Sequence, residues 1–331
     1  MSRVVVARGK GGPEVLHVEQ RAVPEPKPAE VCLRVNLAGV AFGDVMRRRG
    51  VLAPPWSFTP GYDVVGTVDA RGDTAEVSVG QRVAAFMPGP GFGGYADHVC
   101  VHTDRLVAVP DGVDDATAIG LGLNYVTAYQ LIHRFLSLER GDSVLVHGAA
   151  GGVGTAMLDL GALHGLTLFG TASAGKHSAL TARGCTPIDY RSEDFVERMA
   201  SLAPDGVNAV VDGIGGAHLR RSAAVLAPGG GLAALGVSGD LSGGWLGVAA
   251  GFRHLAALRL SGVNARMYAI GQSRGCGLPN IVADWGALLQ HAVAGEVTPV
   301  IGATVPLDQV AEAHRLLDES AVVGKVLLDC R

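Results

Sequence analysis

The chain has 331 residues, a length that is typical of two domains rather than one. Hydrophobic residues make up 48% and charged residues 18%, which supports a large core and excludes a disordered chain. The formal net charge is −4 and the densest basic run is RRR at 47–49, so small-molecule chemistry is favoured over a nucleic-acid or anionic-membrane partner.

The N-terminus and the cysteines favour a cytoplasmic protein. The first residues, MSRVVVARGK, contain too short an apolar run for a secretory signal, and no uninterrupted run of about 18 apolar residues predicts a membrane span. The cysteines are odd in number and none is close to another in sequence, which argues against a disulfide framework and a zinc knuckle. We therefore expect buried or idle thiols, in a reducing cytoplasm, at Cys32, Cys100, Cys185, Cys276 and Cys330.

The first 110 residues predict β structure. The prolines of 23–28 exclude a central strand there, and residues 41–50 predict one short helix that ends at Gly50. Short strand-like runs, separated by Pro and Gly clusters, occur at 3–8, 30–40, 63–70, 81–86 and 95–102.

After residue 115 the pattern changes to helices that alternate with strands. A long helix is expected over about 115–136, and apolar runs such as SVLV at 143–146 suit strands that are buried on both faces. The alternation predicts βαβ units around a parallel sheet. From about 266 the sequence predicts a helix (280–294), an extended segment (298–306), a helix (308–318) and a closing strand (323–329).

The stretch HGAAGGVGTAMLDLGALHG, residues 147–165, lies between a predicted strand and a predicted helix. Its pattern is the dinucleotide fingerprint with Ala149 in place of the first glycine. Gly151 would let the backbone approach a pyrophosphate, and Gly154 would let helix and strand pack closely. Since a helix N-terminus favours phosphate, the stretch predicts a cofactor site that is formed by Ala150, Gly151, Gly152, Val153 and Gly154.

The residues after the second strand of this unit favour NADPH over NADH. An NAD site usually has an acidic residue about 20 positions after the glycines, but the acid found before the third strand, Asp159, falls within the helix. Ser173 and Lys176 lie where the 2′-phosphate is expected, and Tyr190 and Arg191 are placed to close over the adenosine. The alternative, a solvated Lys176 at a helix start, is disfavoured by the helix dipole.

With these elements in place, the chain resembles the medium-chain dehydrogenase/reductase superfamily, in the zinc-free quinone oxidoreductase and enoyl reductase branch that includes zeta-crystallin-like and VAT-like proteins. The resemblance covers nearly the whole sequence. It is carried by GGPEVL (11–16), AGVAFGDVMRRRG (38–50), TPGYDVVGTV (59–68), GDSVLVHGAAGGVG (141–154), GTASAGKHSAL (170–180), IDYRSEDFVER (188–198) and VVGKVLL (322–328).

The resemblance implies an α/β fold with two domains. Residues 1–121 and 266–331 would form a GroES-like β domain, and residues 122–265 a Rossmann NADP-binding domain with a doubly wound parallel sheet. The nicotinamide would lie in the cleft between them. Family members usually pair through the Rossmann domains, so a homodimer is implied as well.

The resemblance also argues against zinc. Zinc-dependent relatives place Cys, His–Glu and Cys at the positions of Ala41, Tyr62–Asp63 and Leu123, and neither alanine nor leucine can ligate a metal. The four-cysteine structural lobe is replaced by MPGPGFGGYADHV at 87–99. We therefore expect no metal and no alcohol oxidation by a Lewis acid.

The chemistry that remains is hydride transfer from NADPH to a quinone or an α,β-unsaturated ketone, a bulky natural-product intermediate being one option. It requires a positioned acceptor, donors to a developing oxyanion, and a proton from a side chain or water. Related reductases often carry tyrosine at the position of Leu52 and asparagine at that of Ala41, so the pocket has lost polar groups.

The candidate catalytic residues are Tyr62, Asp44, Asn124 and Thr127, and most have a structural alternative. Tyr62 either faces the cleft or packs below it, and Asp44 either takes part in catalysis or caps its short helix. Thr127 either approaches the nicotinamide or fills a helix interior. The apolar segment 241–262 roofs a pocket or makes a core or dimer contact. The expected substrate pocket comprises Phe42, Leu52, Trp56, Trp245 and Phe252, with Phe58 beside Trp56.

Loops after later strands complete the expected cofactor site, because ligands bind at the carboxyl edge of a parallel sheet. The resemblance places DGIGG (212–216), LGVSG (235–239), NARMY (264–268) and Lys325 along the cofactor. The residues expected to contact it are Thr127, Gly213, Leu235, Gly236, Val237, Asn264 and Lys325. The eleven histidines show no metal-ligand spacing and are interpreted as surface or core residues.

Two other functions stay open on the sequence alone. The loss of polar groups at Ala41 and Leu52 motivates a non-catalytic NADPH-binding protein, as some relatives are. A redox-neutral biosynthetic enzyme would also reuse the fold, since fold does not determine function.

Overall fold

The computed structural model describes residues 1–51, 57–87, 93–235 and 244–331, and for residues 244–249 it describes the backbone. These residues form two compact units: unit 1, residues 1–126 and 278–331, and unit 2, residues 127–277. The domain boundaries predicted from the sequence, after residues 121 and 265, stay predictions.

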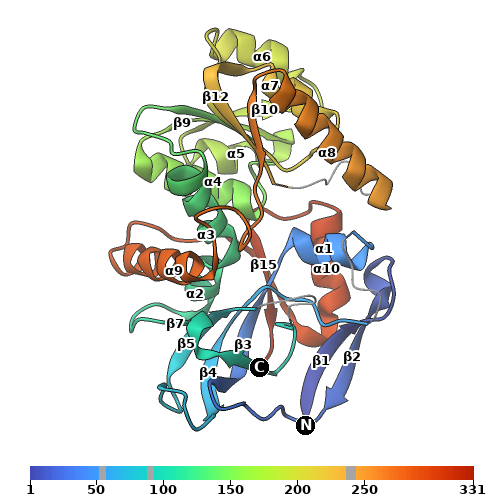
Figure 1. Cartoon of the computed structure of the whole chain (residues 1–331), viewed down its shortest axis with the longest axis vertical. Coiled ribbons are helices and arrows are strands. Elements are labelled where there is room, and N and C mark those ends of the chain that lie inside the picture. Colours follow the sequence, from blue (N-terminus) through green and yellow to red (C-terminus); the bar gives the residue numbers. More distant parts are fainter. Residues whose placement is uncertain (52–56, 88–92, 236–243) are drawn as a thin grey trace. The chain divides into compact units, whose positions relative to one another are not determined.

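Unit 1 is built on a mostly antiparallel sheet that joins both ends of the chain. Figure 1 shows the red strand β15 among the blue and cyan strands, and the register pairs Val326 of β15 with Val40 of β3. Within the described residues the order is β14-β15-β3-β4-β5-β7, with β6 on β3 and a separate β1-β2 pair. The bounds are β1 (Ser2–Ala7), β2 (Leu16–Arg21), β3 (Glu30–Val40), β4 (Asp63–Arg71), β5 (Arg82–Phe86), β6 (His98–His102), β7 (Leu106–Ala108), β14 (Ile301–Pro306) and β15 (Lys325–Asp329).

The helices of unit 1 are short except for one near the C-terminus. The predicted end of the first helix at Gly50 is confirmed, since Gly50 adopts a φ of 95° just after that helix. The Asp114 side chain begins the second helix by accepting the Thr117 N–H at 2.6 Å. The bounds are α1 (Phe42–Arg48), α2 (Asp115–Gly120), α9 (Leu278–Val293) and α10 (Val310–Asp318), with short 3₁₀ turns η1 (Pro13–Val15), η2 (Thr103–Arg105) and η6 (Leu307–Gln309).

The prediction of one long helix over about 115–136 is wrong in one respect, because the helix is interrupted. α2 is followed by α3 (Leu123–Gln130) and by a π-helical turn, η3 (Leu131–Phe135). Asp63 Oδ2 accepts the Leu123 N–H at 2.8 Å, and a Cβ on Gly122 would lie 2.4 Å from the same oxygen. A buried carboxylate therefore separates the two helices, and sequence periodicity does not reveal it.

Unit 2 is built on a parallel sheet. Among its described residues, six strands take the order β10-β9-β8-β11-β12-β13, which is 3-2-1-4-5-6 in chain order and defines a doubly wound sheet. The predicted fold class, a β domain together with a doubly wound parallel-sheet domain, is confirmed. The bounds are β8 (Ser143–His147), β9 (Thr167–Ala172), β10 (Cys185–Asp189), β11 (Val207–Asp212), β12 (Leu226–Ala234) and β13 (Asn264–Met267).

Helices cover both faces of this sheet (Figure 1). Val144, Leu145 and Val146 of β8 are each at most 1% exposed. Since successive residues of a strand point to opposite faces, both faces must be covered, as the uninterrupted apolar run predicts. The bounds are α4 (Gly152–His164), η4 (Ala174–Lys176), α5 (His177–Thr181), α6 (Phe195–Leu202), α7 (His218–Ala223) and α8 (Gly244–Leu260).

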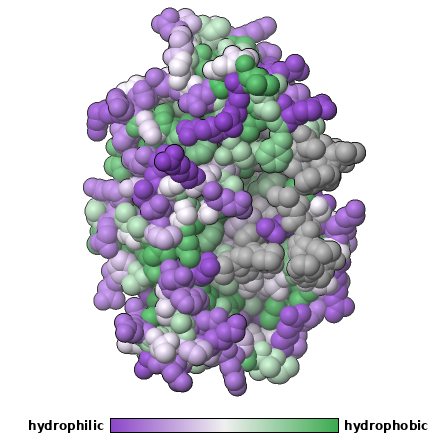
Figure 2. Space-filling view, in the orientation of Figure 1, coloured by the Kyte–Doolittle hydropathy of each residue, from purple (hydrophilic) through white to green (hydrophobic). Residues whose placement is uncertain are grey.

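The surface is mixed in polarity. Figure 2 shows hydrophilic residues over much of the visible face, with smaller hydrophobic patches between them. Among the described residues, every helix is too short or too polar to cross a membrane.

Candidate functional site

The carboxyl edge of the parallel sheet gathers most of the cofactor residues predicted for unit 2. The chain order reverses between β8 and β11, and ligands of doubly wound sheets bind at this switch point. His147 ends β8 and Asp212 ends β11. The turns that leave this edge contain the glycine stretch 148–154, Ser173, Tyr190, Gly213 and Leu235.

The glycine stretch forms a tight turn that leads into α4. Gly148 adopts a φ of 68°, and the Gly151 N–H donates to its carbonyl at 2.9 Å. A Cβ on Gly154 would lie 2.5 Å from that carbonyl oxygen and 2.6 Å from Ala149 Cα. The helix therefore packs so closely on the turn that no side chain fits at this position. Gly151 is exposed and caps α4 without a side-chain hydrogen bond. The first N–H groups of α4 are thus suited to an anion.

A basic patch follows β9 and β10. Burial lowers the pKa of Lys176, and the nearby Arg191 lowers it further, which favours an anion between the two cations. The Arg191 guanidinium lies 5.8 Å from the ring centre of Tyr190, a side chain that is 55% exposed. Ser173 precedes the η4 turn and makes no capping hydrogen bond.

The acid within α4 has another partner. Asp159 forms an ion pair with Arg183 at 2.9 Å. This contact is consistent with the interpretation that Asp159 is not a ribose ligand.

A buried hydrogen-bond network lies beneath the carboxyl edge. His147 Nδ1 is 3.1 Å from Thr171 Oγ1, and His147 Nε2 is 3.2 Å from Ser222 Oγ. The Ser222 hydroxyl donates to Asp212 Oδ2 at 2.6 Å, and His218 Nδ1 contacts the same oxygen at 2.8 Å. The network connects the ends of β8, β9 and β11 to α7.

The same groups hold the backbone of two turns. Asp212 Oδ1 accepts the N–H groups of Ile214 at 2.7 Å and Gly215 at 3.0 Å. Thr171 Oγ1 accepts the Gly148 N–H at 3.2 Å. The network therefore determines the positions of the glycine turn and of the loop that follows β11.

The donors and acceptors assign the tautomer of His147. Because the Ser222 proton goes to Asp212, the Ser222 oxygen accepts from His147 Nε2–H, and the Thr171 hydroxyl donates to Nδ1. A neutral His147 is fully hydrogen-bonded, and burial lowers its pKa to about 3. Burial raises the pKa of Asp212, but the hydrogen bond from His218 and the other donors outweigh it and bring the pKa to about 2.

The network also contains potential metal ligands. In the part of the chain that the structure describes, His147, Asp212 and His218 each offer a ligand atom within 4.8 Å of the others. Hydrogen bonds already use both ring nitrogens of His147 and both oxygens of Asp212, so this donor set fits a hydrogen-bonded network better than a resident metal. Sequence reasoning missed this cluster, although His147 and Asp212 both end strands of the parallel sheet.

In unit 1, Asp44 has the geometry of a structural anchor. It is 0% exposed, and its oxygens accept the N–H groups of Ala41 and Gly61 and the hydroxyl of Tyr95, at 3.0, 2.9 and 3.0 Å. Burial raises its pKa to about 7 in spite of these bonds. The contacts favour the capping interpretation of Asp44 over the catalytic one.

Tyr62 is half-buried and lies over α1. A Cβ on Gly43 would lie 2.3 Å from the Tyr62 hydroxyl oxygen, so this glycine makes room for the phenol. Burial raises the pKa of Tyr62 to about 12, with a smaller opposing effect from a hydrogen bond with Arg47. The phenol is therefore protonated at neutral pH and can donate a hydrogen bond.

Lys325, a predicted cofactor ligand, forms a buried ion pair with Asp63. The side chains are 3% and 0% exposed, and Lys325 Nζ also donates to the Ile119 carbonyl at 2.9 Å. A Cβ on Gly39 would lie 2.1 Å from Asp63 Oδ1, so only glycine fits there. These contacts hold the Lys325 ammonium in the interior of unit 1.

The other predicted residues have varied environments. Asn124 and Thr127 are 8% and 5% exposed and stand one turn apart on α3. Phe42 and Phe252 are 39% and 52% exposed, whereas Phe58 is buried in the core of unit 1. Leu52, Trp56, Gly236, Val237 and the Trp245 side chain lie outside the described residues.

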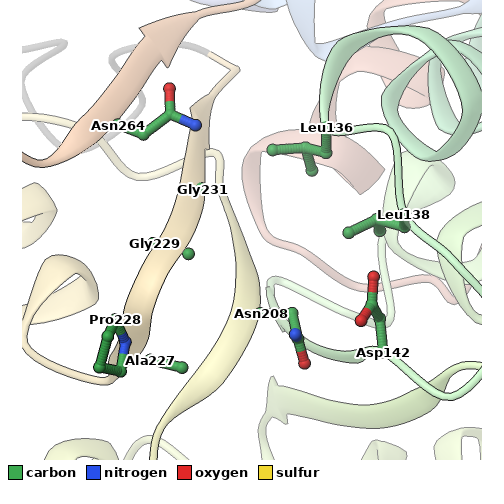
Figure 3. A pocket seen from close by; sticks show the side chains of 10 residues that line it. Leu136, Leu138, Asp142, Asn208, Ala227, Pro228, Gly229, Gly231 and Asn264 are labelled. Carbon is green, nitrogen blue, oxygen red and sulfur yellow. The ribbon is translucent and has the colours of Figure 1, made fainter.

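Asn264 lies at the other edge of the parallel sheet. Asn264 begins β13 and pairs with Gly231, three residues before the end of β12, whereas Met267 pairs with Ala234 at the carboxyl edge. Figure 3 shows Asn264 beside a pocket of about 240 Å³. The structure does not bring Asn264 to the glycine turn. The pocket is lined by Leu136, Leu138, Asp142, Asn208, Ala227, Pro228, Gly229, Gly230, Gly231 and Asn264.

Comparison with known proteins identifies relatives of both units. Residues 27–111 match the family model described as alcohol dehydrogenase GroES-like domain, and residues 185–328 match the one described as zinc-binding dehydrogenase. The human synaptic vesicle membrane protein VAT-1 homolog is 34% identical, over 98% of this chain and 86% of its own length. Human quinone oxidoreductase is 28% identical, over 96% of this chain and 94% of its own length.

A solved structure extends the similarity to a nucleotide complex. A mycobacterial protein in complex with NADPH has a TM-score of 0.85 and 27% identity, with 99% of both chains covered. The name of the second family model refers to zinc, but the side chains of Ala41 and Leu123 contain no atom that can ligate a metal.

Acid should weaken the fold through His147. The unfolded chain binds a proton near the ordinary histidine pKa of about 6.5 and the folded chain only near 3, so unfolding takes up a proton between these values and stability falls as pH falls. From pH 7 to pH 5 the loss through this side chain is about 2 kcal/mol. Urea unfolding at both pH values should show a correspondingly smaller loss for His147→Gln.

The exposed His17→Gln on β2 is the matched control and should behave as the original protein does. His314, whose pKa burial also lowers to about 3, contributes equally in all three proteins. An equal loss in His147→Gln and in the original protein would contradict the neutral, buried assignment.

Removing either partner of the Asp63–Lys325 pair should destabilise unit 1 strongly. Lys325→Met leaves a buried carboxylate without its counter-charge, which costs about 3–5 kcal/mol of unfolding free energy. Asp63→Asn should cost a similar amount, and the double variant less than the sum of the two, as measured by urea unfolding. The exposed Lys27→Met is the control, and strictly additive losses would argue against the pair.

Proposed function

Because this chain belongs to the medium-chain dehydrogenase/reductase superfamily, in its zinc-free quinone oxidoreductase branch, we propose that it is an oxidoreductase that uses NADPH to reduce a quinone or an α,β-unsaturated ketone. One observation carries the proposal: an uncapped helix N-terminus and a pair of cations lie at the same edge of the parallel sheet. A nucleotide with separate phosphate groups fits both features.

The residues of unit 2 fit NADPH in three places. The N–H groups at the start of α4 would hold the pyrophosphate, with Gly151 allowing close approach. Lys176, Arg191 and the Ser173 hydroxyl would hold the 2′-phosphate, since two cations and a donor favour this group over a free ribose hydroxyl. The exposed ring of Tyr190 is suited to stacking on the adenine.

When bound, NADPH supplies the hydride that reduces the acceptor. The chain itself must orient the acceptor and offer donors to the developing negative charge. Tyr62 is the donor that we favour, because its phenol stays protonated. Asn124 and Thr127 are further donors on α3, and Asp44 would act only as an anchor for α1. Water would then supply the proton.

The exposed aromatic side chains favour an apolar acceptor. Phe42 on α1 and Phe252 on α8 are accessible, as a small hydrophobic substrate requires. The homodimer implied by the resemblance is part of the same proposal, and the 90% exposed Leu260 of α8 offers apolar surface to a second copy.

A non-catalytic NADPH-binding protein is the second candidate. It is favoured by Ala41, which lacks a polar group, and by Asp44, whose oxygens are already engaged in three hydrogen bonds. It predicts binding of NADPH without acceptor-dependent oxidation.

The purified protein should consume NADPH when 9,10-phenanthrenequinone or 4-phenyl-3-buten-2-one is added, as followed by nicotinamide absorbance and product identification. Tyr62→Phe should lower kcat by about tenfold or more, with little change in the KM for NADPH, because it removes a donor to the developing charge. Tyr129→Phe, another half-buried tyrosine, is the control. Tight NADPH binding without oxidation by either acceptor would refute the reductase and support the second candidate.

Lys176→Glu should change the cofactor preference. Loss of a charge-assisted hydrogen bond to a phosphate weakens NADPH binding by about 10–100-fold, while NADH binding should change far less. Fluorescence titration with both cofactors measures the ratio. Lys27→Glu, at an exposed lysine of unit 1, should leave both affinities unchanged. An equal loss for NADH and NADPH would mean that Lys176 does not contact a 2′-phosphate.

A further inference from the structure

Two cysteines that are far apart in sequence lie opposite one another in unit 1. Cys32 of β3 pairs with Cys100 of β6 in a regular antiparallel register that extends from Glu30–His102 to Arg34–His98. The argument from sequence spacing against a disulfide therefore does not apply to this pair. Sequence spacing does not reveal it, because the contact depends on strand pairing.

The backbone bonds at both ends of this register identify the type of pair. The Val35 N–H donates to the Asp97 carbonyl at 2.7 Å, and the Thr103 N–H donates to the Ala29 carbonyl at 3.0 Å. Hydrogen-bonded pairs alternate with non-hydrogen-bonded pairs along an antiparallel ladder. Cys32 lies three positions from both Ala29 and Val35, so Cys32–Cys100 is a non-hydrogen-bonded pair.

This type of pair suits a disulfide. Its Cα atoms are typically about 4.5 Å apart and its side chains stand close together on one face. Disulfides span Cα separations of about 4.4–6.8 Å, so the bond requires little backbone movement. Each thiol also shifts the pKa of the other, as expected for two groups that lie close together.

The two thiols differ in access. Cys32 is 1% exposed, whereas Cys100 is partly exposed and is the one that a reagent reaches first. Burial raises the pKa of both thiols, that of Cys100 to about 12, so few thiolates exist at neutral pH. Reaction should therefore be slow at pH 7 and faster in base.

We propose that Cys32 and Cys100 form a redox-active dithiol, which a low-molecular-weight disulfide converts into an intramolecular disulfide. The Cys100 thiolate attacks one sulfur of the reagent, forms a mixed disulfide and releases one thiol. The Cys32 thiolate then attacks the Cys100 sulfur and releases the second thiol. Two electrons and two protons pass from the cysteines to the reagent, which becomes two thiols.

The new bond would tie β3 to β6 around the segment 32–100, which contains α1, β4 and β5. Such a bond restricts the unfolded chain, and a loop of this length gives a substantial entropic effect. Oxidation should therefore raise the midpoint of thermal unfolding by about 5 °C or more. The inference does not depend on the proposed reductase activity.

The experiment treats the full-length protein with oxidised glutathione at pH 7, 8 and 9 and follows its thiols. The denatured protein should lose two of its five thiols, and peptide mass spectrometry should identify a Cys32–Cys100 disulfide. The rate should rise by about tenfold per pH unit, in step with the thiolate fraction. Cys32→Ser, and Cys32→Ala if serine impairs folding, should instead retain a glutathione adduct on Cys100.

Cys185→Ser, at a buried cysteine of β10, is the matched control and should still form the disulfide. Five free thiols after treatment at pH 9 would overturn the proposal. A stable glutathione adduct on Cys100 of the unaltered protein, or a disulfide that includes Cys185, Cys276 or Cys330, would overturn it as well.

Discussion

The buried ion pair between Asp63 and Lys325 is the contact on which the organisation of unit 1 depends. A buried charge is strongly destabilising without its counter-charge, so Lys325 of β15 must stay beside Asp63 of β4. The C-terminal segment therefore becomes part of the first domain. The same carboxylate accepts the first N–H of α3 and so determines where that helix begins. Gly39 and Gly122 leave the space that the carboxylate occupies.

Unit 2 uses a buried polar network in a comparable way. His147, neutral and fully hydrogen-bonded, joins the ends of strands whose turns form the proposed nucleotide site. Asp212 holds the loop after β11 through two backbone N–H groups. Rigid support of this kind would hold the N–H groups that we propose for the phosphate in place before the nucleotide arrives, which would lower the entropic cost of binding. The groups that contact the cofactor in our proposal are separate from the groups that position them.

Much of the fold could be predicted because its signals are local. Apolar runs, glycine positions and the alternation of strands and helices predicted the parallel sheet, the turn at 148–154 and the end of α1. Gly154 could be recognised for the same reason, since close packing of helix on strand excludes any side chain. The interruption at Gly122, however, could not be predicted, because the responsible carboxylate lies some sixty positions earlier in the chain. The position of Asn264, at the first residue of β13, also depends on the strand register, which a motif does not specify.

By itself, the sequence determined the family, the doubly wound sheet and the turn suited to a dinucleotide, because these depend on residue types at short spacings. Only the tertiary structure decided how individual side chains are used. It engaged the oxygens of Asp44 in capping bonds, paired Lys325 with Asp63 and brought Cys32 opposite Cys100. The reason is physical: a buried polar group must find its partner wherever the chain brings one, and that partner is set by strand register and packing rather than by distance along the sequence.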